Sequence, residues 1–260
     1  MVEVARYLYS IAKTGQKEHL GEIGIEKKAV YTVPYEDIAA VVHSCEPKPY
    51  DTKDKTQAEE WIFEHSYVID QATKRFGSVL PFSFDVILPG DDSQIEGWLG
   101  RNYKLLLGEL KGVEGKAEYT IQIYYDYDDL QSKALFGNPE LKDLQSQMEI
   151  ESKGKAYLLS KKLDQRRKEL VSSEEGRLAN KYLLRIHRQV DKLIIDGKRS
   201  WIPEDCRDMK LLASYSCLVR QENVERLGEI LEEINTQDGF RVRFTGPWAP
   251  FSFIKLGELA

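Results

Sequence analysis

By its type and position, His65 is the residue of this sequence best suited to do chemistry. It lies between Trp61 and Val68 on the apolar stripe of a predicted helix. A histidine in such a place could be a metal ligand or a general base, because its charge changes near neutral pH. No second histidine stands at ligand spacing, so we favour a packed core histidine with one hydrogen-bond partner.

The other reactive side chains are scattered along the chain. His43 stands two residues before Cys45, which places both on one strand face, but no third member of a nucleophilic site is evident. The acidic run 126–129 lacks the ordered oxygen ligands and the glycine of a calcium loop, so we interpret it as solvated charge. The basic run 161–168 could face a nucleic acid or an acidic partner, although a solvated helix face is favoured.

Sequence motifs of common enzymes are absent. The chain has no G-x-G-x-x-G, no phosphate-binding G-x-x-x-x-G-K-[ST], no G-x-S-x-G and no H-E-x-x-H. We therefore predict that the protein is not an enzyme and has no catalytic residue, metal site or cofactor. The alternative is a small-molecule enzyme or ligand-binding protein that uses His65, which requires an open pocket and a carboxylate within hydrogen-bond reach of that ring.

Composition narrows the class of protein. The 260 residues carry a net charge of -6, which argues against nucleic-acid binding, since such proteins usually have a basic footprint. Three widely spaced cysteines without a C-x-x-C motif fit reduced thiols. No apolar run approaches the ~20 residues of a membrane-spanning helix, and the N-terminus lacks signal-peptide features. We expect a soluble, cytoplasmic protein with no membrane and no nucleic-acid partner.

The residue periodicity predicts a mixture of helices and strands. Residues 79–88 are apolar but interrupted by Pro81, which points to an edge strand or a bulge. Residues 127–154 are polar and are interpreted as a boundary or a mobile insertion. The predicted strands are 4–12, 29–33, 38–43, 79–88, 117–126, 211–219 and 240–244, and the predicted helices are 61–76, one behind Ser93, 155–171, 178–194 and 224–234. S-x-x-E capping signatures at Ser93 and at Ser172 predict the starts of two of these helices.

The order of these elements predicts the fold class. Strands and helices are mixed without the regular alternation of doubly wound folds, which favours an α+β fold with helices packed on antiparallel sheets. The strict alternation of residues 117–126 is typical of a half-buried strand in such a sheet. We place two domains at residues 1–128 and 129–260.

Four segments stand in order over nearly the whole chain: RYLYSIA near the start, HSYVIDQATKRFGSVLPFSF from His65, GKAYLLSKK from Gly154 and TGPWAPFSF from Thr245. Together they resemble the GvpL/GvpF family of gas vesicle proteins. The V-L-P region and the C-terminal signature are the most specific. The chain departs from the family at residues 83–86, where R-F-G-T is common, and at Ser10, where glycine is common.

The resemblance implies a role in forming gas vesicles, which are gas-filled protein shells that give cells buoyancy. It implies an assembly factor or minor structural component that contacts the small hydrophobic shell protein and other accessory proteins, and a ferredoxin-like C-terminal domain. We favour the F-type, although the quoted residues do not separate F-type from L-type roles. A ferredoxin-like RNA binder is disfavoured by the acidic charge. The candidate interaction or architectural residues are His65, Pro81, Phe82, Phe84, Pro247, Trp248 and Phe251.

Overall fold

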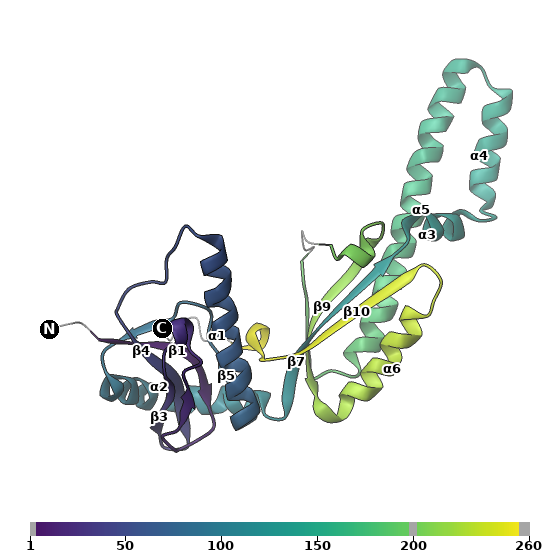
Figure 1. Ribbon diagram of the computed structural model, residues 1–260. Helices are drawn as coiled ribbons and strands as arrows, with labels where there is room; N and C mark the ends of the chain where they lie inside the picture. Colours follow the sequence, from purple (N-terminus) through teal and green to yellow (C-terminus); the bar gives the residue numbers. More distant parts are fainter. Residues whose placement is uncertain (1–3, 198–201, 255–260) are drawn as a thin grey trace. The chain divides into compact units, whose positions relative to one another are not determined.

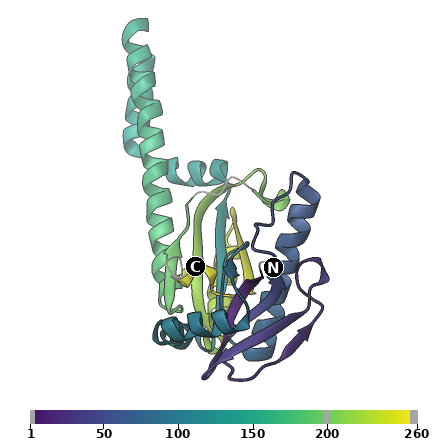
Figure 2. The ribbon, with the colours of Figure 1, turned by 90° about the vertical axis from the view of Figure 1, so that its left-hand side faces the viewer.

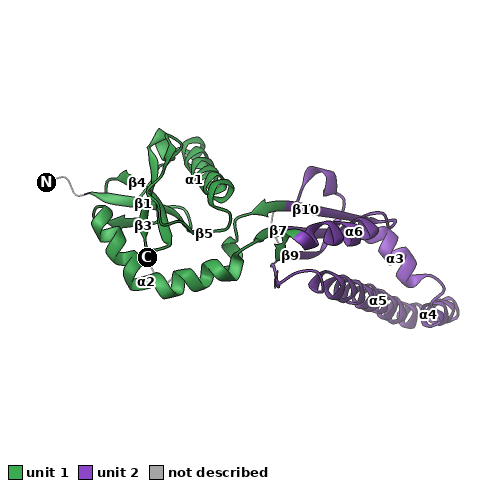
Figure 3. Ribbon diagram, turned by 90° about the horizontal axis from the view of Figure 1, so that it is seen from below, with its two compact units in different colours: residues 1–119, 218–221, 246–260 green, residues 120–217, 222–245 purple. Residues whose placement is uncertain are grey.

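The computed structural model describes residues 4–197 and 202–254, and its packing separates into two compact units (Figures 1 and 3). Unit 1 holds residues 1–119, 218–221 and 246–260, and unit 2 holds 120–217 and 222–245. The chain therefore passes between the units more than once, and its C-terminal segment belongs to unit 1. The two units are defined only by the contacts within each of them, which does not test where a domain ends. The predicted domain division at 128/129 therefore stays a prediction.

The sheet of unit 1 is built around the first strand of the chain. β1 (Ala5–Ala12) pairs antiparallel with β4 (Ile38–Cys45) along its length. On its other side β1 pairs with two short strands, β5 (Val79–Pro81) and β6 (Ile87–Pro89). β3 (Val30–Tyr35) and β2 (His19–Gly21) complete the order β2-β3-β4-β1-β5.

Two long helices cover the two faces of this sheet, because successive side chains of a strand point to opposite sides. α1 (Lys55–Phe76) buries Val68 and Ala72 against Tyr7 and Tyr9 of β1. α2 (Asp92–Val113) packs against the opposite face, where Leu8 lies. Asp54 caps α1 through the amides of Thr56 and Gln57, and Gly77 ends the helix with a φ of 81°.

The segment 79–88 differs from its prediction as one interrupted strand. It forms β5 and β6, joined by a turn in which Asp85 has a φ of 69°. Pro81 occupies the end of β5 and Phe82 is buried directly after it, so this edge is covered by side chains. The predicted S-x-x-E cap at Ser93 is also wrong, because Asp91 and Gln94 form the capping box of α2.

Unit 2 contains most of a four-stranded sheet with the order β10-β7-β9-β8. Its elements follow one another as strand, helices, strand, strand, helix and strand. The α+β class is confirmed, whereas the name ferredoxin-like stays a prediction. The bounds are β7 (Lys116–Tyr125), β8 (Lys192–Ile195), β9 (Lys210–Arg220), β10 (Phe240–Trp248) and α6 (Val224–Asn235).

The region predicted as a boundary or mobile insertion is helical. α3 (Tyr127–Leu135) and α4 (Pro139–Ile150) occupy it, and each begins with a side-chain cap, Asp126 for α3 and Asn138 for α4. The capping signature at Ser172 lies inside α5 (Lys153–His187), which is one continuous helix of 35 residues. Leu193 and Ile194, predicted in a helix, lie in β8.

Helix α5 packs over one face of the second sheet. Tyr215 donates a hydrogen bond to the Ala179 carbonyl, and Tyr125 donates to Glu175. The predicted face of β7, with Ile121 and Ile123, is buried as expected. Residues of the opposite face, including Glu118 and Gln122, are buried as well, so β7 is more enclosed than its alternating pattern predicts.

Candidate functional site

The candidate residues from the sequence fall into two groups in unit 1. Pro81 and Phe82 are buried and Phe84 is half-buried around His65, beneath α1. Trp248 and Phe251, together with Pro247, line an open groove at the surface. The first group is part of the architecture of unit 1, and the second group is available to another molecule.

His65 is held in one tautomer by its two partners. Its Nε2 lies 3.1 Å from the carbonyl oxygen of Phe82, which can only accept, so Nε2 carries the proton. Nδ1 then accepts a hydrogen bond of 2.9 Å from the Tyr7 hydroxyl, which in turn accepts from the amide of Asp85. Thus His65 joins α1, β1 and the turn after β5 through neutral hydrogen bonds.

A second histidine extends this buried network. His43 Nδ1 lies 2.7 Å from the Tyr9 hydroxyl, and its Nε2 lies 3.0 Å from the Tyr50 hydroxyl. The ring of His43 stacks on Tyr7 with centroids 5.0 Å apart. We call His43, His65 and their three tyrosine partners, Tyr7, Tyr9 and Tyr50, the histidine–tyrosine cluster.

The geometry required by the enzyme hypothesis is not present at His65. The side chain is only 3% exposed, and its partners are a hydroxyl and a carbonyl rather than a carboxylate. Burial lowers the pKa of His65 to about 4, and burial followed by the charge of Lys28 lowers that of His43 to about 4. Both rings are therefore neutral at pH 7 and sealed in the core, as favoured for His65.

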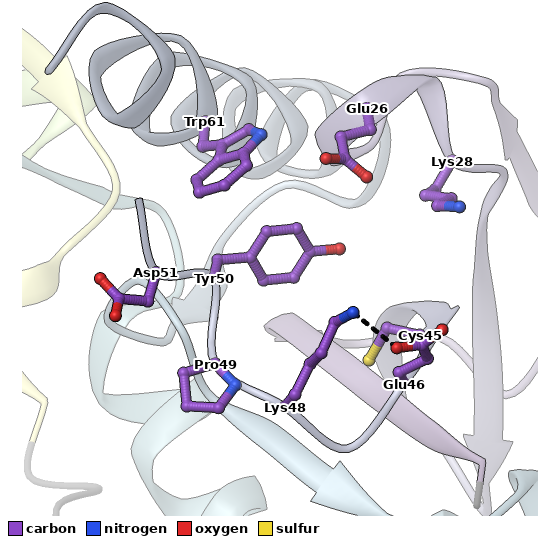
Figure 4. A pocket seen from close by; sticks show the side chains of 9 residues that line it. All are labelled: Glu26, Lys28, Cys45, Glu46, Lys48, Pro49, Tyr50, Asp51 and Trp61. Carbon is purple, nitrogen blue, oxygen red and sulfur yellow. Dashed lines mark ion pairs between the residues drawn. The ribbon is translucent and has the colours of Figure 1, made fainter. Parts of the chain in front are cut away.

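A polar cleft lies beside this cluster (Figure 4). It has a volume of about 330 Å³ and is bounded by the rings of Tyr50 and Trp61, which meet edge to face at 5.2 Å. Lys48 and Glu46 pair across 2.6 Å at its rim. Burial raises the pKa of the Cys45 thiol, which disfavours the thiolate form that a nucleophile needs.

The larger opening of unit 1 is a groove between α1 and the C-terminal segment. It has a volume of about 660 Å³, and most of its lining is apolar. Phe63 and Tyr67 stand one turn apart on the outer side of α1, and Phe63 is 72% exposed. Trp248, 55% exposed, and Phe251 rise from the opposite side. We call this the aromatic groove.

The charged side chains around the aromatic groove have partners within the protein. Asp70 pairs with Lys74 across 2.7 Å, one helical turn apart on α1. Lys116 donates to the carbonyl of Gly112, and Glu118 accepts from Ser252. The groove therefore presents aromatic surface next to charged groups that are already hydrogen-bonded or paired, which suits an apolar ligand.

Glu118 fixes the C-terminal segment that forms one side of the groove. Its two carboxylate oxygens accept from the Ser252 amide at 2.9 Å and from the Ser252 hydroxyl at 2.6 Å. Phe253 then inserts into the core beside α2, and Ala249 packs on the side of α1. The groove is thus held by a buried carboxylate and two apolar contacts.

Replacing Glu118 by glutamine is expected to loosen this segment. The glutamine amide has an NH2 donor where the carboxylate has its second acceptor oxygen, so one of the two hydrogen bonds from Ser252 is lost. Losing such a buried hydrogen bond lowers the free energy of unfolding by about 1–3 kcal/mol. We expect faster proteolysis near Trp248 and a lower urea midpoint. Glu114→Gln is the matched control, because Glu114 makes only an exposed pair with Lys13 and should change stability by less than about 1 kcal/mol. Equal behaviour of the two variants would contradict this role of Glu118.

The α1 side of the groove was not predicted from the sequence. Phe63 and Tyr67 were not singled out there, and Ile62 beside them is exposed as well. Their spacing could have indicated this surface. Two aromatic residues that are four positions apart and outside the buried stripe lie next to each other on the outer face of the helix. Their proximity to Trp248 depends on the tertiary fold, and no local pattern encodes it.

The remaining sequence hypotheses are explained by local structure. Asp126 accepts hydrogen bonds from the amides of Asp128 and Asp129 at the start of α3, and Asp129 pairs with Lys133. Within residues 4–197 and 202–254, no cluster of three or more potential metal ligands occurs. In the same part of the chain, no helix has the length and apolar character needed to cross a membrane.

Comparison with known families supports the sequence resemblance. The family described as "Gas vesicle synthesis protein GvpL/GvpF" matches residues 5–255. Gas vesicle protein L of Haloferax mediterranei is 32% identical over 232 residues, covering 88% of this chain and 72% of that protein. Gas vesicle protein L1 of Halobacterium salinarum is 31% identical over 256 residues, covering 97% and 91%.

The fold agrees with that of a solved structure. The crystal structure of gas vesicle protein GvpF from Anabaena sp. PCC7120 superimposes with a TM-score of 0.73 over 96% of this chain and 98% of that one. At 17% identity this match shows the fold alone. The match over residues 5–255 and the two relatives establish the family: the chain is a member of the GvpL/GvpF family of gas vesicle synthesis proteins.

Proposed function

We propose that this chain is a gas vesicle assembly factor or minor structural component that binds the small hydrophobic shell protein during vesicle formation. Membership of the GvpL/GvpF family supports a role connected with gas vesicles. The observation that carries the binding proposal is the aromatic groove, about 660 Å³ in volume and lined mainly by apolar side chains. In the cell we place the protein in the cytoplasm, associated with gas vesicles.

A shell protein that polymerises must keep its apolar surface covered before assembly, because exposed apolar patches and strand edges aggregate. The buried state of Pro81 and Phe82 removes the edge of β5 as a place for strand addition. The aromatic groove supports the other route, in which exposed rings shield an apolar segment of the subunit. Tyr67, Trp248 and Phe251 are the proposed contacts.

The type within the family stays a proposal. Relatives named L are 32% and 31% identical, and gas vesicle protein F of a Streptomyces species is 24% identical. The F-type preference from the sequence therefore has no support from these identities. We propose the same shell-binding activity for either type, because the aromatic groove is its basis.

Binding of purified full-length protein to the shell subunit tests the proposal. We expect the wild type to retain the subunit in a pull-down, and Trp248→Ala or Tyr67→Ala to weaken binding about tenfold, as is common for a central interface aromatic. Phe136→Ala is the matched control, since Phe136 is an exposed aromatic side chain in unit 2. It should bind as the wild type does.

Two results would contradict the proposal. One is wild-type protein that retains no shell subunit, and the other is equal loss of binding in the groove variants and in Phe136→Ala. Fractionation of washed vesicles, probed for this chain with and without protease, tests the proposed association. Recovery of the chain only in the vesicle-free fraction would exclude a structural role and leave the assembly role.

A further inference from the structure

The hairpin formed by α4 and the first half of α5 is a second surface that the aromatic groove does not explain. These two helices extend from the rest of unit 2 as a pair (Figure 2). A small apolar core joins them, with Leu141 and Leu144 of α4 against Leu163 of α5. Because Leu159 and Leu170 also contact this core, one stripe of α5 faces α4 and the opposite stripe is uncovered.

The uncovered stripe carries two large apolar side chains. Tyr157 is 62% exposed and Leu158 is 67% exposed, and both lie in the second turn of α5. Neither belongs to the core between the helices: Tyr157 lies away from the stripe of Leu159 and Leu163, and Leu158 lies on its flank. Two adjacent exposed apolar residues near the tip of a helical hairpin are a feature of contact surfaces.

The first half of α5 is strongly basic within an acidic protein, and Lys161, Lys162 and Lys168 lie on or beside the uncovered stripe. Residues 153–168 contain seven basic side chains and one acidic side chain, whereas the whole chain has a net charge of -6. Lys161 lies 5.7 Å from the ring centroid of Tyr157. In the described part of the chain, no acidic group forms an ion pair with Lys162 or Lys168, and both are exposed.

We propose that this face of α5 binds an acidic amphipathic helix of a partner protein. The apolar side chains of that helix would cover Tyr157 and Leu158, and its carboxylates would pair with Lys161, Lys162 and Lys168. From residue 157 to residue 168 the stripe is about 16 Å long, since a helix rises 1.5 Å per residue. A partner helix of about three turns matches this length.

The arrangement favours a helical protein segment over other anionic partners. A nucleic acid would satisfy the lysines but offers phosphates rather than an apolar surface next to Leu158. A flat anionic membrane would contact the tip of the hairpin, whereas the lysines continue along its side as far as Lys168. A straight helix can contact the apolar pair and the lysines at once.

A designed peptide tests the inference on the full-length protein. The probe is a fluorescein-labelled 21-residue helix with leucines and glutamates on adjacent stripes, and its scrambled form is the first control. We expect the helical peptide to bind more tightly than the scrambled peptide, and we expect its affinity to fall as the salt concentration is raised. The variant K161E/K162E/K168E should lose at least about tenfold in affinity, and L158S should lose about fivefold.

A matched charge variant separates this surface from the net charge of the protein. K53E/K104E/K111E makes the same change in net charge at exposed lysines of unit 1 and should bind within about twofold of the wild type. Circular dichroism would check that all variants fold. The proposal fails if the scrambled peptide binds equally, or if both triple variants bind alike. It also fails if RNA or phosphatidylserine vesicles bind at least as tightly as the helix and L158S has no effect.

Discussion

Replacing Gly246 by alanine is expected to destabilise the protein by about 2–4 kcal/mol and to disrupt the aromatic groove. Gly246 has a φ of 135°, a conformation that residues with a side chain rarely adopt. An added Cβ would also lie 2.8 Å from the backbone oxygen of Glu118 and 2.8 Å from the ring of Tyr119. The backbone cannot relieve both the unfavourable φ and the close contacts of the Cβ without moving the C-terminal segment that begins at Gly246.

The movement would reach the groove because Gly246 directly precedes the residues that line it. Pro247 and Trp248 follow at once, and Ser252 must still meet Glu118. We therefore expect Gly246→Ala to lower the urea midpoint and to weaken binding of the shell subunit as much as Trp248→Ala does. A variant with lower stability but full binding would show that the groove does not depend on this position.

Gly108→Ala is the matched control for the alanine substitution. Gly108 lies inside α2, and nothing stands within 4 Å of an added Cβ. Alanine favours a helix over glycine by up to about 1 kcal/mol, so this variant should be slightly more stable than the wild type. The two glycine substitutions should therefore change the urea midpoint in opposite directions.

Much of the secondary structure of unit 1 was predictable from local sequence. β1 and β4 are continuous runs that are buried over most of their length, and α1 has an apolar stripe that ends at Gly77. The segment 79–88 misled the prediction, since its apolar residues are continuous but its chain turns at Asp85. A turn held by the Tyr7 hydroxyl, far away in the sequence, has no local signature.

The helices of unit 2 were harder to predict because their buried stripes are short. α4 buries only Leu141 and Leu144, so its sequence is polar enough to be taken for an insertion. The Ser172 signature failed for a related reason, since a capping motif in the middle of a helix is overridden when the helix packs on both sides of it. Tertiary contacts with the sheet and with α4 keep α5 continuous.

The candidate site was predictable in part. The C-terminal signature led to Pro247, Trp248 and Phe251, which do line one groove. His65 was correctly favoured as a core residue. It has two hydrogen-bond partners instead of the one expected, the Tyr7 hydroxyl of β1 and the Phe82 carbonyl between β5 and β6. The role of Glu118 could not be predicted, because nothing in the local sequence distinguishes it from other carboxylates on strands. Its partner Ser252 is 134 residues away and is brought next to it only by the tertiary fold.

The protein is expected to lose stability steeply as the pH falls from about 6.5 to 4. His43 and His65 are neutral in the folded state, where burial lowers the pKa of each to about 4. In the unfolded chain both titrate near 6.5, so the unfolded state binds up to two more protons between these values. Each such proton costs about 1.4 kcal/mol of stability per pH unit.

The size and the range of the effect follow from these two pKa values. Well above pH 6.5 both rings are neutral in the folded and in the unfolded state, and the full stability is present. At pH 5 each histidine should have removed about 2 kcal/mol relative to pH 7, and near pH 4 the loss should level off as the folded state begins to bind protons. Urea unfolding followed by circular dichroism at half-unit steps of pH measures the slope.

Substituting the two buried histidines should abolish this slope while lowering stability at pH 7. In His43→Gln/His65→Gln, the amide can replace some hydrogen bonds to Tyr9 and Phe82 but cannot titrate. His19→Gln/His187→Gln is the matched control, because it removes the other two histidines of the chain, both exposed. It should keep the wild-type slope. If instead the control variant flattens the curve and the buried pair does not, the acid sensitivity arises at the surface. In that case the pKa values of His43 and His65 in the folded protein would not lie below those of the unfolded chain.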